Sequence, residues 1–202
     1  MKKTTIFLIS ILFLFAGKLQ AQTMFGNTAL TLSKGVVSLG VNADYATEID
    51  LLSTSIVAPP EDIAYFFHLG YGTSRSTDIG INIGKAWGTM YYGLDFEKNL
   101  LKEGNLSISG TIGGHYWDNV GADADIIASV KIEDFYLTTG FDVDANINEL
   151  YDGTLELYFP AYIPVELEFN PNSKMALTFE ANIAVNNRAF TTVGAGVNFY
   201  FN

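Results

Sequence analysis

The sequence contains no cysteine and only five prolines among its 202 residues. The absence of cysteine excludes disulfide bonds, thiolate zinc sites, a cysteine nucleophile and a lipid-modified N-terminal cysteine. Basic residues are also few, since 11 lysines and arginines stand against 22 aspartates and glutamates. This balance argues against nucleic-acid binding, which needs a surface of the opposite charge.

Long hydrophobic runs are missing as well, so no segment could cross a membrane as a mature helix of about 18 apolar residues. The N-terminal stretch "MKKTTIFLISILFLFAGKLQA" has a basic start, a short apolar core over 6–15 and a small residue at its end. This pattern is typical of a secretory signal cleaved after Ala21. We expect residues 1–21 to be the signal peptide and 22–202 to be one domain. Three of the 11 basic residues lie in 1–21, so the mature chain has 8 basic and 22 acidic residues and a formal charge of −14.

The sequence is rich in apolar and aromatic residues, and these alternate with small or polar residues. Hydrophobic residues make up 49% of the chain and aromatic residues 14%. After about residue 34, apolar residues alternate with small or polar ones in segments such as "GVVSLGVNADY", "DIGINIGKAW" and the final "TTVGAGVNFYFN". This is the period of a β-strand rather than of a helix. The sequence therefore predicts an all-β chain.

The direction of the apolar face separates a soluble barrel with an apolar cavity from a membrane barrel. About ten strands with about five apolar side chains each would supply far more apolar volume than such a barrel can enclose. The apolar face must then point to lipid, and the sheet must close on itself to pair every backbone group. We predict a closed antiparallel transmembrane β-barrel of about ten strands, with eight or twelve as the alternatives. Pro160 and Pro164 interrupt the eighth strand, which we expect to stay one long strand because its apolar parity continues through both.

Turn signals predict where the strands are connected. Short polar connections are expected at the periplasmic end, at 73–78, 98–105, 133–134 and 170–174. Extracellular connections are expected at 46–62, 88–89, 118–124, 146–153 and 186–188. The segment 46–62 is the longest of these, and we interpret it either as a contact surface or cover for the barrel mouth or as a solvated loop.

Aromatic residues fall near the ends of the expected strands, as they do in the interfacial girdles of membrane barrels. One girdle is predicted from Tyr45, Tyr65, Trp87 and Tyr116, and the other from Tyr71, Phe135, Phe169 and Phe201. Lys85 is a charge on the lipid-facing side. We expect it to extend to the interface, either with no specific partner or next to lipopolysaccharide phosphates.

The segments "LGYGTSRSTDIGINIG" and "IPVELEFNPNSKMALTFEANIAV", with the aromatic last strand, resemble the small single-domain outer-membrane β-barrels of Gram-negative bacteria, in the porin-like group. The resemblance covers nearly all of the mature chain. It implies a location in the outer membrane, contact with its lipid and lipopolysaccharide, and insertion by the barrel-insertion machinery. Such barrels usually end in the aromatic residue itself, whereas here Asn202 follows Phe201. No cofactor and no resident metal are expected.

The polar face of the predicted strands should point into the barrel, where it would place many acids and few bases. The inward bases are Lys131, His68 and His115. The inward acids are expected to be Asp44, Asp95, Glu97, Asp125, Glu133, Asp142, Asp144, Glu156, Glu166, Glu168 and Glu180. These predict a narrow, cation-favouring pore or a site for small cations, or else acids that merely lie in water at the rims.

Three function classes follow. The first is a porin-like protein with an acidic lumen, and the second is a structural or surface-interaction barrel without transport. The third is an outer-membrane hydrolase that uses His115 with Asp118. It is the least favoured, because no serine lies at a matching position and no GxSxG motif is present.

Overall fold

The computed structural model describes residues 29–47, 63–86, 88–117, 119–149 and 154–202. Within these ranges no helix is long and apolar enough to cross a membrane. The chain instead forms eleven strands. They are β1 Val37–Ala46, β2 Ala64–Gly72, β3 Thr77–Ala86, β4 Thr89–Glu103, β5 Leu106–Trp117, β6 Asn119–Ile132, β7 Phe135–Glu149, β8 Leu155–Tyr158, β9 Ala161–Asn172, β10 Met175–Ala184 and β11 Thr192–Phe201.

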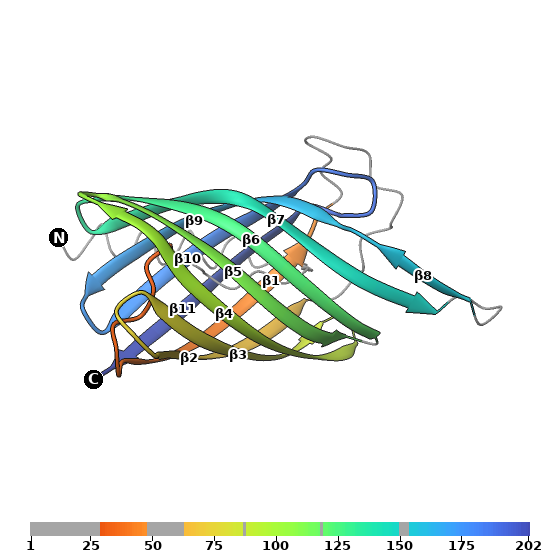
Figure 1. The fold of residues 1–202 in the computed structure, drawn as a ribbon, viewed down its shortest axis with the longest axis horizontal. Helices are drawn as coiled ribbons and strands as arrows, with labels where there is room; N and C mark the ends of the chain where they lie inside the picture. Colours follow the sequence, from red (N-terminus) through yellow and green to blue (C-terminus); the bar gives the residue numbers. More distant parts are fainter. Residues whose placement is uncertain (1–28, 48–62, 87, 118, 150–153) are drawn as a thin grey trace.

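The strands close into a barrel (Figure 1). Neighbours in sequence pair antiparallel from β1 to β7 and from β9 to β11. The wall is closed because β1 also pairs antiparallel with β11 over the whole of both strands. The C terminus and the turns that join β2 to β3, β4 to β5, β6 to β7 and β9 to β10 lie at one end of the barrel, called here the C-terminal end. The other is called the opposite end.

The predicted strand number is confirmed, although one strand is divided. β8 and β9 occupy one position in the wall, since β7 pairs with β8 over 146–149 and with β9 over much of 135–143. The division falls at Phe159 and Pro160, whereas we expected one continuous strand. Proline has no N–H to give to the ladder, which explains a break at Pro160. Pro164 is accommodated inside β9, opposite Asn182.

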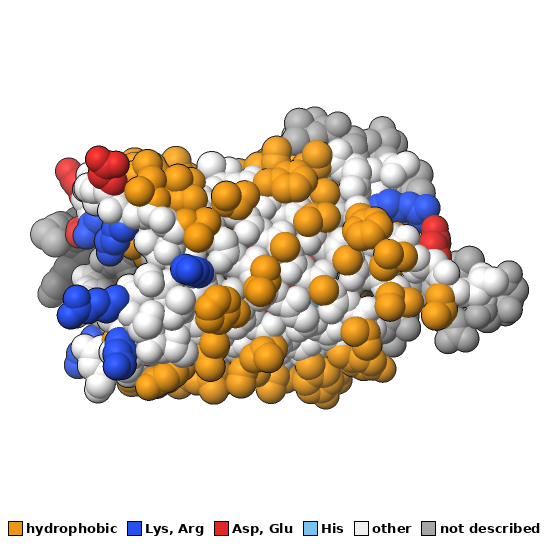
Figure 2. Space-filling model, in the orientation of Figure 1, with side chains coloured by type: hydrophobic (Ala, Val, Ile, Leu, Met, Phe, Trp, Pro, Cys, Tyr) orange, Lys and Arg blue, Asp and Glu red, His pale blue; other side chains and the backbone are white. Residues whose placement is uncertain are grey.

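The predicted alternation decides which side chains face outward. In β3, Ile79, Ile81 and Ile83 are 38–42% exposed. Their neighbours Asp78 and Asn82 are 8% and 2% exposed. The outer wall in Figure 2 is accordingly covered with hydrophobic side chains between the two ends, while charged side chains gather mainly at the ends. An apolar belt around a closed sheet is the arrangement that hydrocarbon requires.

The aromatic residues predicted for the C-terminal end lie together there. Tyr71 and Phe201 both pair with Val37, so the three form one row across neighbouring strands. Phe135 and Phe169 stack with ring centroids 4.8 Å apart. At the opposite end, Tyr65 and Tyr116 are exposed, and Tyr45 is half-buried. Trp87 lies outside the described residues. Lys85 is exposed and pairs with Tyr65.

The predicted turns are partly confirmed. Tight turns do occur at 133–134 and between β2 and β3, and Glu133 adopts a positive φ of 55° in the first of them. Three predicted connections, 98–105, 118–124 and 170–174, are instead mostly strand, because their polar residues continue the ladders of β4, β6 and β9. Most of the 46–62 segment, and residues 150–153, lie outside the described residues.

The apolar belt predicts a depth-dependent cost for charge on the outer wall. Leu94 is 59% exposed in the middle of β4. The Leu94→Arg variant should have a free energy of unfolding about 2–4 kcal/mol lower than that of the wild type. Ile132 is 56% exposed at the C-terminal end. The Ile132→Arg variant should have a free energy of unfolding lower by at most about 1 kcal/mol. Denaturant titration of both variants in lipid vesicles measures the difference, and equal losses would contradict a belt that faces hydrocarbon.

Candidate functional site: the acidic interior

The interior of the barrel carries acids from seven strands of its wall: β1, β3, β4, β6, β7, β9 and β10. Those that are buried are Asp44, Asp78, Glu97, Asp142, Asp144, Glu166, Glu168 and Glu180. Those that are half-buried are Asp95, Asp123 and Asp125. Every lysine and arginine that the structure describes is exposed. The only basic side chains among these acids in the described interior are therefore those of His68 and His115.

Two predicted interior residues lie elsewhere, and one lies at the rim. Glu156 is in β8, which extends beyond the other strands in Figure 1, and it accepts a hydrogen bond from Arg188 Nη2 at 3.0 Å. Glu133 is exposed in the turn between β6 and β7. The parity of these two acids matches the inner face, but Glu156 lies beyond the barrel interior and Glu133 lies in a turn. Lys131 is exposed and lines the wide mouth at the C-terminal end, which has a volume of about 520 Å³.

One group of acids converges where β1, β11, β10 and β9 lie side by side. Asn42 Nδ2 donates hydrogen bonds to Asp44 Oδ1 at 2.8 Å and to Glu180 Oε1 at 2.6 Å. Glu166 pairs with Glu180 on the neighbouring strand, and both are buried. Asp44 Oδ2 and Glu166 Oε1 have no hydrogen-bond partner among the described residues. Buried carboxylates so close together must be neutralised by protons or by cations.

A second chain of polar side chains runs across β2, β3 and β4. The Nδ1 atom of His68 lies 2.6 Å from Asn82 Oδ1, and the Asn82 amide donates in turn to Asp95 Oδ2. On the neighbouring strands β5, β6 and β7, His115 lies between Asp123 and Asn146. Its two ring nitrogens thus face an aspartate and an asparagine rather than a serine hydroxyl. Asp118, proposed as its partner in a hydrolase, lies outside the described residues.

Glycines make the room for these carboxylates. A Cβ atom at Gly194 would overlap Asp44 Oδ1 and lie 3.0 Å from Glu180 Oε1. A Cβ atom at Gly113 would overlap the Asp123 carboxylate and lie 2.7 Å from Asp95 Oδ1. The small residues on the inner face therefore set where the acids can point.

The residues before β1 enter the barrel from its C-terminal end. Ala29 is buried, and its N–H donates to Ser129 Oγ of β6 at 2.7 Å, while its carbonyl accepts from Asn99 Nδ2 of β4 at 2.9 Å. The Leu32 N–H donates to Asp78 Oδ2 at 2.6 Å. Residues 29–33 thus lie across the interior and are called here the inner segment.

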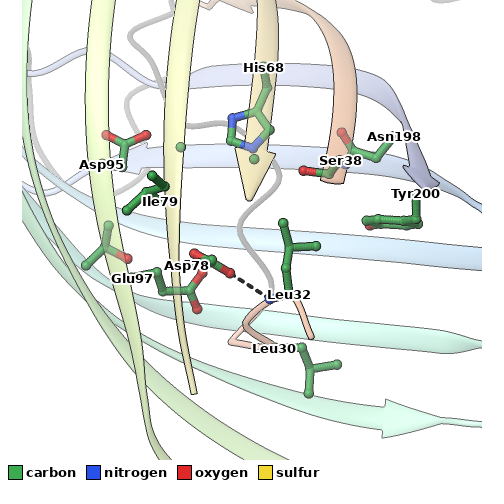
Figure 3. A pocket seen from close by; sticks show the side chains of 13 residues that line it. Leu30, Leu32, Ser38, His68, Asp78, Ile79, Asp95, Glu97, Asn198 and Tyr200 are labelled. Atoms are coloured by element: carbon green, nitrogen blue, oxygen red, sulfur yellow. Dashed lines mark hydrogen bonds between the residues drawn. The ribbon is translucent and has the colours of Figure 1, made fainter. Parts of the chain in front are cut away.

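A cavity of about 60 Å³ remains beside the inner segment (Figure 3). Leu30 and Leu32 line one side of it, and acids of β3 and β4 such as Asp78 and Glu97 line another. Towards the opposite end, an apolar cluster is also buried, with Phe66 and Tyr91 in edge-to-face contact at 5.6 Å. The interior is therefore narrow, and its walls are not polar throughout.

Sequence reasoning missed several interior residues. Asp78 and Asp123 were assigned to connections, because both lie in polar segments that resemble turns. The period-two parity, if continued through 118–124, would have placed Asp123 inside with Asp125. The inner segment gave no such signal, since it is held by residues far along the chain: Ala29 and Ser129 are 100 positions apart.

No protein-family model matches this chain, and no curated protein is significantly similar to it. Among solved structures, an outer membrane channel from Pseudomonas putida F1 is similar over 89% of this chain and 100% of that chain, with 8% identity and a TM-score of 0.61. The NanC porin is similar over 80% of this chain and 98% of that chain, with 10% identity and a TM-score of 0.49. At these identities the likeness shows the fold alone. The chain is a closed antiparallel β-barrel with the fold of outer-membrane barrels.

The packing of Asp44 against Gly194 yields a test of the interior. Gly194→Ala should cost about 1–3 kcal/mol, because the new methyl group has to displace the buried Asp44 carboxylate. Asp44→Ala should lower the free energy of unfolding by less in the Gly194→Ala background than in the wild type. Gly114→Ala is the control: its Cβ atom would meet nothing closer than Gly121 O at 3.8 Å, so the change should stay within about 0.5 kcal/mol. Urea unfolding in detergent measures all four variants, and equal stability of the two glycine variants would contradict this packing.

Proposed function

We propose that this protein is an outer-membrane barrel whose acidic interior takes up small cations and favours them over anions. The observation that carries the proposal is the charge of the interior. Acids from seven strands of the wall point inward, whereas each lysine and arginine in the described ranges is exposed. Rings of carboxylates in a narrow pore attract cations and repel anions.

The membrane location rests on the outer wall and on the N terminus. The wall presents an apolar belt with aromatic residues at its ends, as a lipid-exposed barrel does. The signal-like residues 1–21 would direct the chain out of the cytoplasm. The similar Pseudomonas putida protein is an outer membrane channel, which supports the same location and class. Outer-membrane lipid and lipopolysaccharide would then surround the barrel, and the barrel-insertion machinery would place it there.

A specific observation favours a second candidate, a barrel without transport. The inner segment crosses the C-terminal end of the interior and is fixed by hydrogen bonds to β3, β4 and β6. Together with the buried Phe66 and Tyr91 near the opposite end, it leaves a narrow path. Passage of ions would require the inner segment to move aside. If the inner segment stays in place, ions cannot pass, and the barrel is a structural or surface-interaction protein without transport.

Conductance in planar bilayers separates the two candidates. The protein is purified from the outer-membrane fraction and compared with a variant that lacks residues 22–33. Under a KCl gradient, we expect both to be cation-selective and the shortened variant to have the larger conductance, because its interior is clear of the inner segment. Glu166→Gln in the shortened variant should lower the cation-to-anion permeability ratio by about twofold or more.

Glu156→Gln is the matched control, since Glu156 is an acid on β8 outside the interior. Its selectivity should equal that of the unsubstituted shortened variant. Anion preference in the shortened variant would contradict the acidic pore. If the full chain does not conduct, the second candidate is the correct one, whether or not the shortened variant conducts.

A further inference from the structure

Three potential metal ligands come together on adjacent strands of the barrel. His115 of β5, Asp123 of β6 and Asp144 of β7 each offer one donor atom, and these atoms all lie within 4.8 Å of one another. Asp123 and Asp144 are directly opposite each other in the antiparallel register. His115 and Asp144 are buried, at 8% and 7% exposure, and Asp123 is half-buried.

The surroundings of His115 fix its ring and shape the space around it. The Tyr91 ring stacks on the imidazole, with centroids 5.6 Å apart and an interplanar angle of 27°. A Cβ atom at Gly121 would overlap His115 Nε2 and Asn146 Oδ1. A side chain at either Gly113 or Gly121 would therefore displace one of the candidate ligands or the partner of His115.

Both nitrogens of the His115 ring face oxygen atoms. Nδ1 is 3.1 Å from Asp123 Oδ1, and Nε2 is 2.8 Å from Asn146 Oδ1. A neutral imidazole has only one N–H, so it can donate to only one of these oxygens. With the N–H on Nε2 and donated to Asn146, the Nδ1 lone pair and the Asp123 carboxylate point at each other. A cation bound by both relieves that repulsion, and an outer hydrogen bond from the second ring nitrogen is typical of metal-binding histidines.

A buried hydroxyl on the next strand is a second, independent observation. Tyr162 of β9 is 2% exposed, and its hydroxyl has no hydrogen-bond partner among the described residues. Tyr162 pairs directly with Asp142, which lies two residues from Asp144 on the same inner face of β7, and both aspartates are buried. A buried hydroxyl without a partner is costly. A water molecule on a metal ion held by Asp144 is the kind of partner it lacks.

We propose that His115, Asp123 and Asp144 bind one divalent transition-metal ion of the Zn²⁺ type. One imidazole nitrogen and two carboxylate oxygens suit Zn²⁺, and the two negative charges match its charge. Donor atoms around tetrahedral Zn²⁺ lie roughly 3.3–3.6 Å apart, so the aspartate side chains need to shift by only about 1 Å. Three protein ligands leave a fourth position for water. The sequence gives no signal for this candidate site, because Asp123 lies in a polar segment, 118–124, whose composition predicts a connection.

This inference deepens the proposed function and rests on the same acidic interior. Zinc binding is measured in detergent with no voltage, so it can fail while the conductance is cation-selective. Likewise, an absence of conductance leaves the zinc measurement untouched. The two proposals are therefore tested separately.

The full barrel, freed of metal with EDTA, is titrated with ZnCl₂ by isothermal calorimetry. We expect one zinc ion per chain, and affinities at least about tenfold lower in His115→Gln and in Asp144→Asn. Asp134→Asn is the control, because Asp134 is an acid in the exposed turn between β6 and β7, outside both the interior and the ligand set. Its affinity should stay within about threefold of the wild type, since only its weak long-range charge is lost.

Zinc X-ray absorption on the wild-type protein keeps the test independent of variant folding. One imidazole nitrogen and otherwise oxygen in the zinc coordination shell supports the site. A shell without imidazole overturns it, as does equal zinc affinity in His115→Gln and Asp134→Asn. In either case His115 is instead a member of the hydrogen-bonded network with Asp123 and Asn146.

Discussion

The pairing of β1 with β11 is the interaction on which the rest of the structure depends. It closes the sheet, so that every strand of the described wall except the short β8 has a neighbour on both sides. A closed wall is the condition for exposing an apolar face to hydrocarbon, because backbone groups there can find partners only inside the protein. Once the wall is closed, the period of two sends every second side chain into a confined interior. The apolar belt and the acidic interior therefore follow from the same constraint.

Confinement gives the interior its chemical character. Acids such as Asp44, Glu166 and Glu180 share a small volume with no lysine or arginine in the part of the chain that the structure describes. Glycines on neighbouring strands leave the space into which these carboxylates turn. Such an interior takes up protons or cations, whether or not ions pass through it. In the proposed channel, ion passage would depend instead on the inner segment 29–33, which lies across the C-terminal end.

Much of this could be predicted from the sequence, and the failures have identifiable physical reasons. The outward residues of β3 and the inward acids of β7 and β9 follow from parity alone. Parity cannot show where a strand leaves the barrel interior, and so Glu156 was misplaced. A strand segment whose polar residues face an acidic interior has the same composition as a turn. Residues 118–124 were therefore predicted to be a connection, and Asp123 was not predicted to face the interior. The inner segment is positioned by contacts between residues 100 positions apart in the chain, and no local pattern encodes them.

The orientation of the two faces can be measured most directly on β4, because the chain has no native cysteine. Leu94→Cys and Asp95→Cys are neighbours in that strand, one facing outward and one inward. Each is labelled with a small environment-sensitive fluorophore, and the protein is inserted into vesicles of brominated lipid. The account predicts strong quenching by the lipid at position 94 and little at position 95. Equal quenching at both positions, or stronger quenching at position 95, would contradict it.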